Sequence, residues 1–141
     1  MKERTFVALL ILVMLPVLVL PLFDTADGPA CGSIRIPAAG LTANVYYIHQ
    51  PQTCGCCGML WNGGQVDIKE DVSAVRIYDV ADMTTIDGTH HVLECVEIVS
   101  CIRVGRWLIG WSGVLRTNGD VLLCTSANRW PFVRVLRLTR L

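Results

Sequence analysis

Apolar and polar positions alternate along most of the chain after residue 34, and this pattern predicts β-strands. Leu41–Ile48 alternates clearly, and three apolar residues occupy every second position of 107–111. His91–Arg103 is longer, and both of its faces are largely apolar, which is typical of a central strand. The predicted strands are 34–36, 41–48, 65–68, 75–78, 83–86, 91–103, 107–111, 121–124 and 133–141.

Turn residues separate these segments. Asp87-Gly88 and Thr117–Asp120 are turn signals, and His49–Gly64 combines proline, glycines and three cysteines, which excludes a regular element there. Lys69–Ala74 fits a short helix or a turn that precedes the strand over 75–78. No long helix is predicted after residue 33, so we expect one all-β domain over residues 34–141, built as a barrel or a sandwich.

The N-terminus differs from the rest of the chain. Three of residues 1–5 are charged, residues 6–23 are apolar or proline throughout, and residues 24–33 form a linker. Eighteen apolar residues are at the lower limit for a helix that spans a bilayer. Lys2 and Arg4 precede the run, which predicts a cytoplasmic N-terminus and a domain outside the cell membrane. The segment is either a retained single-pass anchor or a signal peptide whose cleavage releases a secreted domain.

The charge of the chain argues against one class of partner. The formal net charge is zero and only 17% of residues are charged, so we expect no nucleic acid to bind. The arginines near the C-terminus fall on both faces of the predicted last strand rather than in one patch. They are Arg129, Arg134, Arg137 and Arg140.

Seven cysteines require an explanation in a chain whose domain is predicted to lie outside the cytoplasm. Disulfides are the usual state there, and an odd number leaves one thiol over. Cys95 and Cys101 would be too far apart to form a bridge if both lie on one strand. Cys54, Cys56 and Cys57 suggest a metal site, but a second pair of ligands at a zinc spacing is missing. We therefore expect neither a metal nor another cofactor.

A nucleophilic site is predicted near the C-terminus. Cys124 ends an apolar strand, and Arg134 lies on the following strand. A thiol at a strand end can act as a nucleophile, and a neighbouring guanidinium can stabilise a carboxylate or a developing oxyanion. The alternative is that Cys124 is a buried core residue and Arg134 a surface residue.

Both ends of the domain resemble sortases. The segments that carry the resemblance are Ile36–Leu41 with Val45–Tyr47, the start Cys31–Pro37 shared with short sortase-like proteins, the strand end Leu122–Thr125, and Trp130–Val133. The resemblance implies a closed β-barrel with one N-terminal transmembrane or signal helix. It also implies a transpeptidase in which a cysteine thiolate attacks a peptide sorting signal and transfers the acyl group to an amine.

The resemblance implies roles for five residues. Cys124 or, in the register set by Trp130, Ser126 would be the nucleophile, and Arg134 would stabilise the tetrahedral intermediate. His90 or His91 would have to serve as acid and base, because 59–71 contains no histidine. The chain is thus predicted to be an active sortase-like transpeptidase or an inactive relative of one. A non-catalytic, membrane-tethered and disulfide-stabilised β binding module is the alternative.

Overall fold

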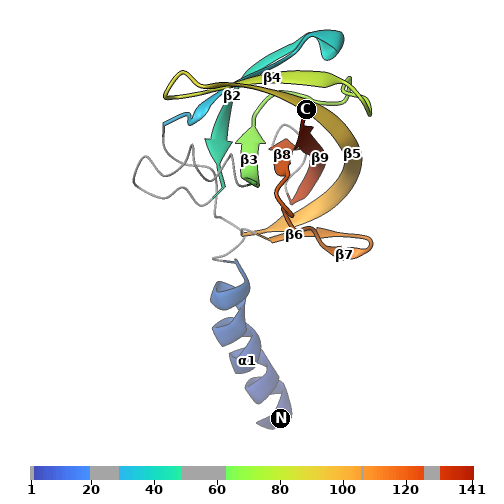
Figure 1. The fold of residues 1–141 in the computed structure, drawn as a ribbon. Helices are drawn as coiled ribbons and strands as arrows, with labels where there is room; N and C mark the ends of the chain where they lie inside the picture. The colour runs from blue at the N-terminus through green and yellow to red at the C-terminus, as the bar shows by residue number, and fades with distance from the viewer. Residues whose placement is uncertain (1, 20–28, 49–62, 106, 126–130) are drawn as a thin grey trace.

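A computed structural model describes residues 2–19, 29–48, 63–105, 107–125 and 131–141 of the chain (Figure 1). One α-helix, α1 (Lys2–Val19), and a 3-10 turn, Pro37–Ala39, accompany the strands of these ranges. The strands are β1 (Gly32–Ile36), β2 (Leu41–Tyr47), β3 (Gly64–Ile68), β4 (Val80–Thr85), β5 (His90–Val104), β6 (Trp107–Gly110), β7 (Gly113–Val114), β8 (Val121–Thr125) and β9 (Phe132–Arg140).

Seven of the strands form a closed barrel. Their order is β4-β1-β2-β3-β8-β9-β5, and β4 also pairs with β5, which closes the ring. The hairpin β6–β7 extends the sheet outward from the far end of β5, as Figure 1 shows. The neighbours β3 and β8 are parallel, whereas the other strand pairs are antiparallel. The predicted all-β barrel is confirmed, and closure leaves few free strand edges.

One predicted strand is wrong. Residues 75–78 belong to an irregular segment between β3 and β4, and β4 starts at Val80 rather than at the predicted residue 83. Val72 and Val75 from this segment are buried in the barrel core, which explains their apolar character without a strand. Tyr78 adopts a left-handed backbone conformation (φ 73°), and its N–H donates to the Cys95 carbonyl oxygen at 2.7 Å. That bond holds the segment against β5.

The interior of the barrel is built from alternating strand positions. Strand β2 shows the pattern most clearly, since every second residue from Leu41 to Tyr47 is buried. Strand β8 is buried at all five positions, because side chains cover both of its faces. Val121 and Leu123 face the barrel core, while Leu122 and Cys124 face a second apolar cluster outside the barrel. We call this second set the outer cluster; its buried members are Ile48, Cys101, Leu108, Leu122, Cys124, Val133 and Val135.

Strand β5 changes faces in its middle. Cys95 is opposite Leu138 of β9 and Glu97 is opposite Arg137, so Val96 is an extra residue that forms a β-bulge. The single uninterrupted strand predicted for 91–103 therefore contains a bulge, and its residues change faces beyond Cys95. Before the bulge Leu93 and Cys95 face the barrel core, and after it Ile98 takes that side.

A buried ion pair joins strands that are not neighbours. Nη1 of Arg103 on β5 lies 3.2 Å from Oδ2 of Asp67 on β3, and both side chains are almost completely buried. Strands β8 and β9 lie between these two strands in the sheet. Burying two charges is costly unless they pair, so separating Arg103 from Asp67 would be unfavourable. The pair therefore holds β3 and β5 together on the two sides of the outer cluster.

Helix α1 covers most of the apolar N-terminal segment. Its side chains are exposed at every position described, residues 2–13. The predicted membrane or signal segment is 6–23, and its last four residues, 20–23, lie outside the described residues. Within the described part of the chain, no helix has both the length and the apolar character needed to cross a membrane.

The close approach of β1 and β4 makes Gly32 sensitive to substitution. A Cβ atom at this position would overlap the backbone carbonyl oxygen of Thr84 and lie 3.2 Å from the Thr85 Cα. We predict that Gly32→Ala lowers the free energy of unfolding by about 1–3 kcal/mol, because one strand must move. Ser33→Ala, at the exposed neighbouring position, is the control and should change it by less than about 0.5 kcal/mol. Equal effects in urea unfolding would contradict this packing.

The buried ion pair gives a second stability prediction. Arg103→Met should lower the free energy of unfolding by about 3–5 kcal/mol, because the Asp67 carboxylate stays buried without its partner. The double variant Asp67→Leu/Arg103→Met should recover most of that loss. Arg137→Gln is a matched control, since Arg137 pairs with partly exposed Glu97 at 3.4 Å and should cost less than about 1 kcal/mol. Both variants are measured by urea unfolding. If Arg103→Met lowers the free energy of unfolding by no more than Arg137→Gln does, the buried pair does not stabilise the fold.

Candidate functional site

The predicted nucleophile Cys124 lies inside the outer cluster. Its side chain has no exposed surface, and its Sγ is 4.0 Å from the Leu122 carbonyl oxygen. Burial raises the thiol pKa well above its usual value, the nearby Asp67 carboxylate raises it further, and the Arg103 guanidinium opposes the shift only in part. A thiol in these surroundings stays protonated near neutral pH and is a poor nucleophile.

The other described cysteines are also structural in character. Cys95, Cys101 and Cys124 carry free thiols, so the predicted disulfide stabilisation is wrong for these three. Burial raises the pKa values of Cys95 and Cys101. The predicted obstacle to a Cys95–Cys101 bridge is confirmed, since both lie on β5. Cys54, Cys56 and Cys57 lie outside the described residues, and in the described ranges no three His, Cys, Asp or Glu side chains gather closely enough for a metal.

Arg134 lies close to Cys124 in the sheet but on the other face. Cys124 is opposite Val135 and Thr125 is opposite Arg134, so the side chains of Cys124 and Arg134 point to opposite sides. Thr125 Oγ1 donates to the carbonyl oxygen of Glu70 at 2.7 Å, which joins the end of β8 to the segment after β3.

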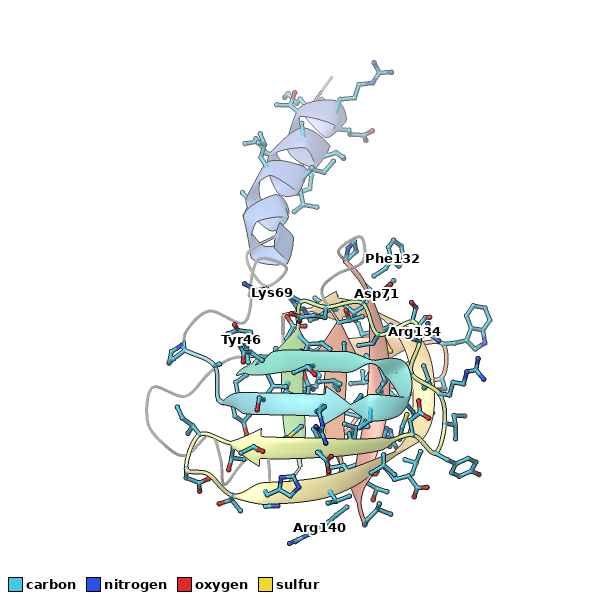
Figure 2. All side chains as sticks on the ribbon, turned by 90° about the horizontal axis from the view of Figure 1, so that it is seen from above. Tyr46, Lys69, Asp71, Phe132, Arg134 and Arg140 are labelled. Carbon is cyan, nitrogen blue, oxygen red and sulfur yellow. The ribbon has the colours of Figure 1, made fainter. Side chains whose placement is uncertain are left out.

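Asp71 shares the Arg134 end of the barrel, where Figure 2 labels both residues. Hydrogen bonds from Ser73 hold the pKa of Asp71 below its usual value, and the Arg134 charge adds a smaller effect. This end therefore carries an exposed carboxylate and a guanidinium, but the described residues there include no histidine.

The two described histidines lie at the opposite end of the barrel. His90 and His91 begin β5, whereas the row that contains Cys124 crosses β5 at Val99, eight residues later. Eight residues of strand span roughly 25 Å, so neither imidazole can reach the Cys124 thiol. Figure 2 labels Arg134 and Arg140 at the two ends of β9, and the Arg140 charge acts on His91.

Both described imidazoles lie near groups other than the Cys124 thiol. His90 Nε2 is 3.5 Å from Asp82 Oδ1, and its Nδ1 is 3.4 Å from Thr84 Oγ1. Burial lowers the pKa of His91, and the Arg140 charge lowers it further. The third histidine, His49, lies outside the described residues, as does the alternative nucleophile Ser126.

Sequence reasoning missed the two charged residues that do surround Cys124. Asp67 is the register partner of Cys124 on β3, and Arg103 acts on the same thiol. A signal for both was present, because each is a single charge between apolar residues of a strand, in Val66-Asp67-Ile68 and Ile102-Arg103-Val104. Thus the structure brings Cys124 together with Asp67 and Arg103 and separates it from the predicted histidines.

No protein-family model matches the chain, and no curated protein matches it. Among solved structures, the chain is similar to sortase A from Corynebacterium diphtheriae, with a TM-score of 0.51 and 14% identity over 82% of this chain. It spans 62% of that chain. A lid mutant of the same sortase gives a TM-score of 0.52 at 14% identity, over 90% of this chain and 78% of the mutant. Sortase C2 of Group B Streptococcus pilus island 1 gives 0.50 at 10% identity, over 82% and 77%. The chain therefore has the closed β-barrel fold of the sortases.

Proposed function

We propose that this protein is a non-catalytic relative of the sortases, a binding module in which Cys124 is a core residue rather than a nucleophile. The observation that supports this most directly is the complete burial of the Cys124 side chain beside Asp67. A cysteine nucleophile needs a thiolate and an open path to its substrate, and Cys124 lacks both. No histidine lies beside it among the described residues, because His90 and His91 are at the far end of β5, and the neighbouring Asp67 carboxylate is paired with Arg103.

A second candidate function is transpeptidation at Ser126. The register favours it, because Arg134 is directly opposite Thr125, the residue that precedes Ser126. A guanidinium at that position would stabilise a developing oxyanion. A serine hydroxyl also needs a base to become nucleophilic, and this candidate would have to draw one from outside the described residues.

We also propose that the barrel lies outside the cytoplasm and that residues 6–23 direct it there. The support is the uninterrupted apolar sequence of this segment and the positive charges of Lys2 and Arg4 before it. A retained segment keeps the protein in the membrane fraction after an alkaline carbonate wash. Recovery of a shortened chain from the medium would instead identify a cleaved signal peptide.

The core role of Cys124 predicts a loss of stability when its side chain is shortened. Cys124→Ala should lower the free energy of unfolding by about 1–2 kcal/mol, since it removes a fully buried group from the outer cluster. Substitution of a catalytic residue often has the opposite effect, because active sites are built at the expense of stability. Ser33→Ala is the exposed control. An increase in stability for Cys124→Ala in urea unfolding would contradict the core role.

A peptide-cleavage assay separates the two candidates. We expect no acyl transfer from a panel of sorting-signal peptides to a glycine amine, at any pH between 6 and 9, because the buried thiol remains protonated. If transfer does occur, Ser126→Ala, Cys124→Ala and Arg134→Gln identify its source. If Ser126→Ala abolishes transfer and Cys124→Ala does not, transpeptidation at Ser126 is supported. The proposal of a non-catalytic module is then overturned.

A further inference from the structure

One face of the sheet remains apolar where the sheet leaves the barrel. Phe132 of β9 is opposite Ile102 of β5, Ile102 is opposite Ile109 of β6, and Ile109 is opposite Val114 of β7. Residues that are directly opposite across neighbouring strands project to the same side. These four side chains therefore form a continuous row across four strands. Trp107 lies two residues before Ile109 on β6 and shares its face.

The side chains of this face are exposed to an unusual degree. Ordinary surfaces carry single exposed apolar residues, whereas a contiguous group of large ones marks a binding surface. We call the group the apolar face. Its members and their exposed fractions are Ile102 40%, Trp107 50%, Ile109 42%, Trp111 103%, Val114 45% and Phe132 59%.

The hairpin part of the apolar face carries positive charge only. From Cys101 to Gly119 the sequence contains three arginines and no aspartate or glutamate. Arg103 is neutralised by Asp67, whereas Arg116 is exposed. Arg134 lies on the same side of β9 as Phe132, two residues further along the strand, but it shares its end of the barrel with the exposed carboxylate of Asp71. A partner that presents apolar groups below a layer of negative charge would complement this surface.

We infer that the apolar face binds the surface of a lipid bilayer that contains anionic lipids. Tryptophan prefers the boundary between headgroups and acyl chains, because its ring is apolar and its N–H can still reach a polar group. Nearby arginines are attracted to anionic headgroups. Figure 1 shows the hairpin β6–β7 projecting from the end of the barrel that faces the apolar helix α1. The inference rests on the proposed location of the protein at a membrane.

The depth of contact follows from the backbone of the hairpin. Strand β7 has two residues and is the last strand in the sheet order, so one of its sides has no strand partner. Unpaired backbone groups cannot enter the hydrocarbon core without a large cost. The tip around Trp111 should therefore lie among the headgroups and the upper part of the acyl chains rather than span the bilayer.

Tryptophan quenching in the full-length protein tests this contact. The protein is reconstituted into phosphatidylcholine vesicles with 30% phosphatidylglycerol and phospholipids brominated at defined chain positions. We expect lipids brominated near the headgroup to quench more than lipids brominated near the chain end. Trp107→Phe/Trp111→Phe removes the two reporters on the apolar face, of the four tryptophans in the chain, and should reduce quenching at least twofold. Ile109→Ser/Val114→Ser keeps both reporters and should reduce quenching similarly, because the tip loses apolar contact.

Matched controls make each outcome decisive. Ile86→Ser removes an apolar side chain that is more exposed than Ile109 or Val114, from the turn between β4 and β5, and should leave quenching unchanged. Arg116→Gln, or vesicles without phosphatidylglycerol, should lower it. Equal quenching in the wild type and the Trp107→Phe/Trp111→Phe variant would overturn the inference. So would cross-linking of two copies through the hairpin, or displacement of the face from lipid by a bound peptide. The assay reports hairpin contact whether or not Cys124 is catalytic, so its failure is distinct from failure of the proposed function.

Discussion

Closure of the barrel depends on one long strand. Strand β5 pairs with β4 near its start, with β9 along most of its length, and with β6 at its end. The start of β5 completes the ring, and its far end carries the β6–β7 extension. The same strand thus keeps His90 and His91 apart from the row of Cys124, because pairing fixes the register on both sides. Chemistry that needs the imidazole of His90 or His91 beside that thiol would require this register to change.

The outer cluster determines the character of the thiol. In an open groove, Cys124 would be accessible from the outer face of β8. Here Leu108 and Leu115 of the segment between β5 and β8 pack with the cluster, and the Asp67–Arg103 pair borders it. The residues on this face of β8 and its neighbours instead form a second core. This packing explains how a chain can have the fold of the sortases and still bury the cysteine at the end of this strand.

Much of the barrel could be predicted from local pattern, because strands such as β2 have one buried and one exposed face. The irregular segment between β3 and β4 could not, since Val72 and Val75 enter the core without a regular period. The bulge at Val96 was equally invisible, because both faces of β5 are apolar and an extra residue leaves no trace in the sequence pattern. The candidate site was predicted less well than the fold. The placement of Cys124 and Arg134 on adjacent strands was predicted correctly. The faces to which their side chains point, and the burial of Cys124, could not be predicted, because they depend on pairing between distant segments.

The rate of alkylation of Cys124 in the folded protein directly tests whether this thiol is a buried core group. The full-length protein is treated with iodoacetamide between pH 6 and 9, and each cysteine is followed by mass spectrometry. A fully buried thiol that reacts only through opening of the fold should label at least roughly 100-fold more slowly than the same thiol in guanidinium chloride. Its rate should also stay slow across this pH range. Fast labelling of Cys124 in the native protein, with an apparent pKa below that of an ordinary thiol, would contradict the account and restore a cysteine nucleophile.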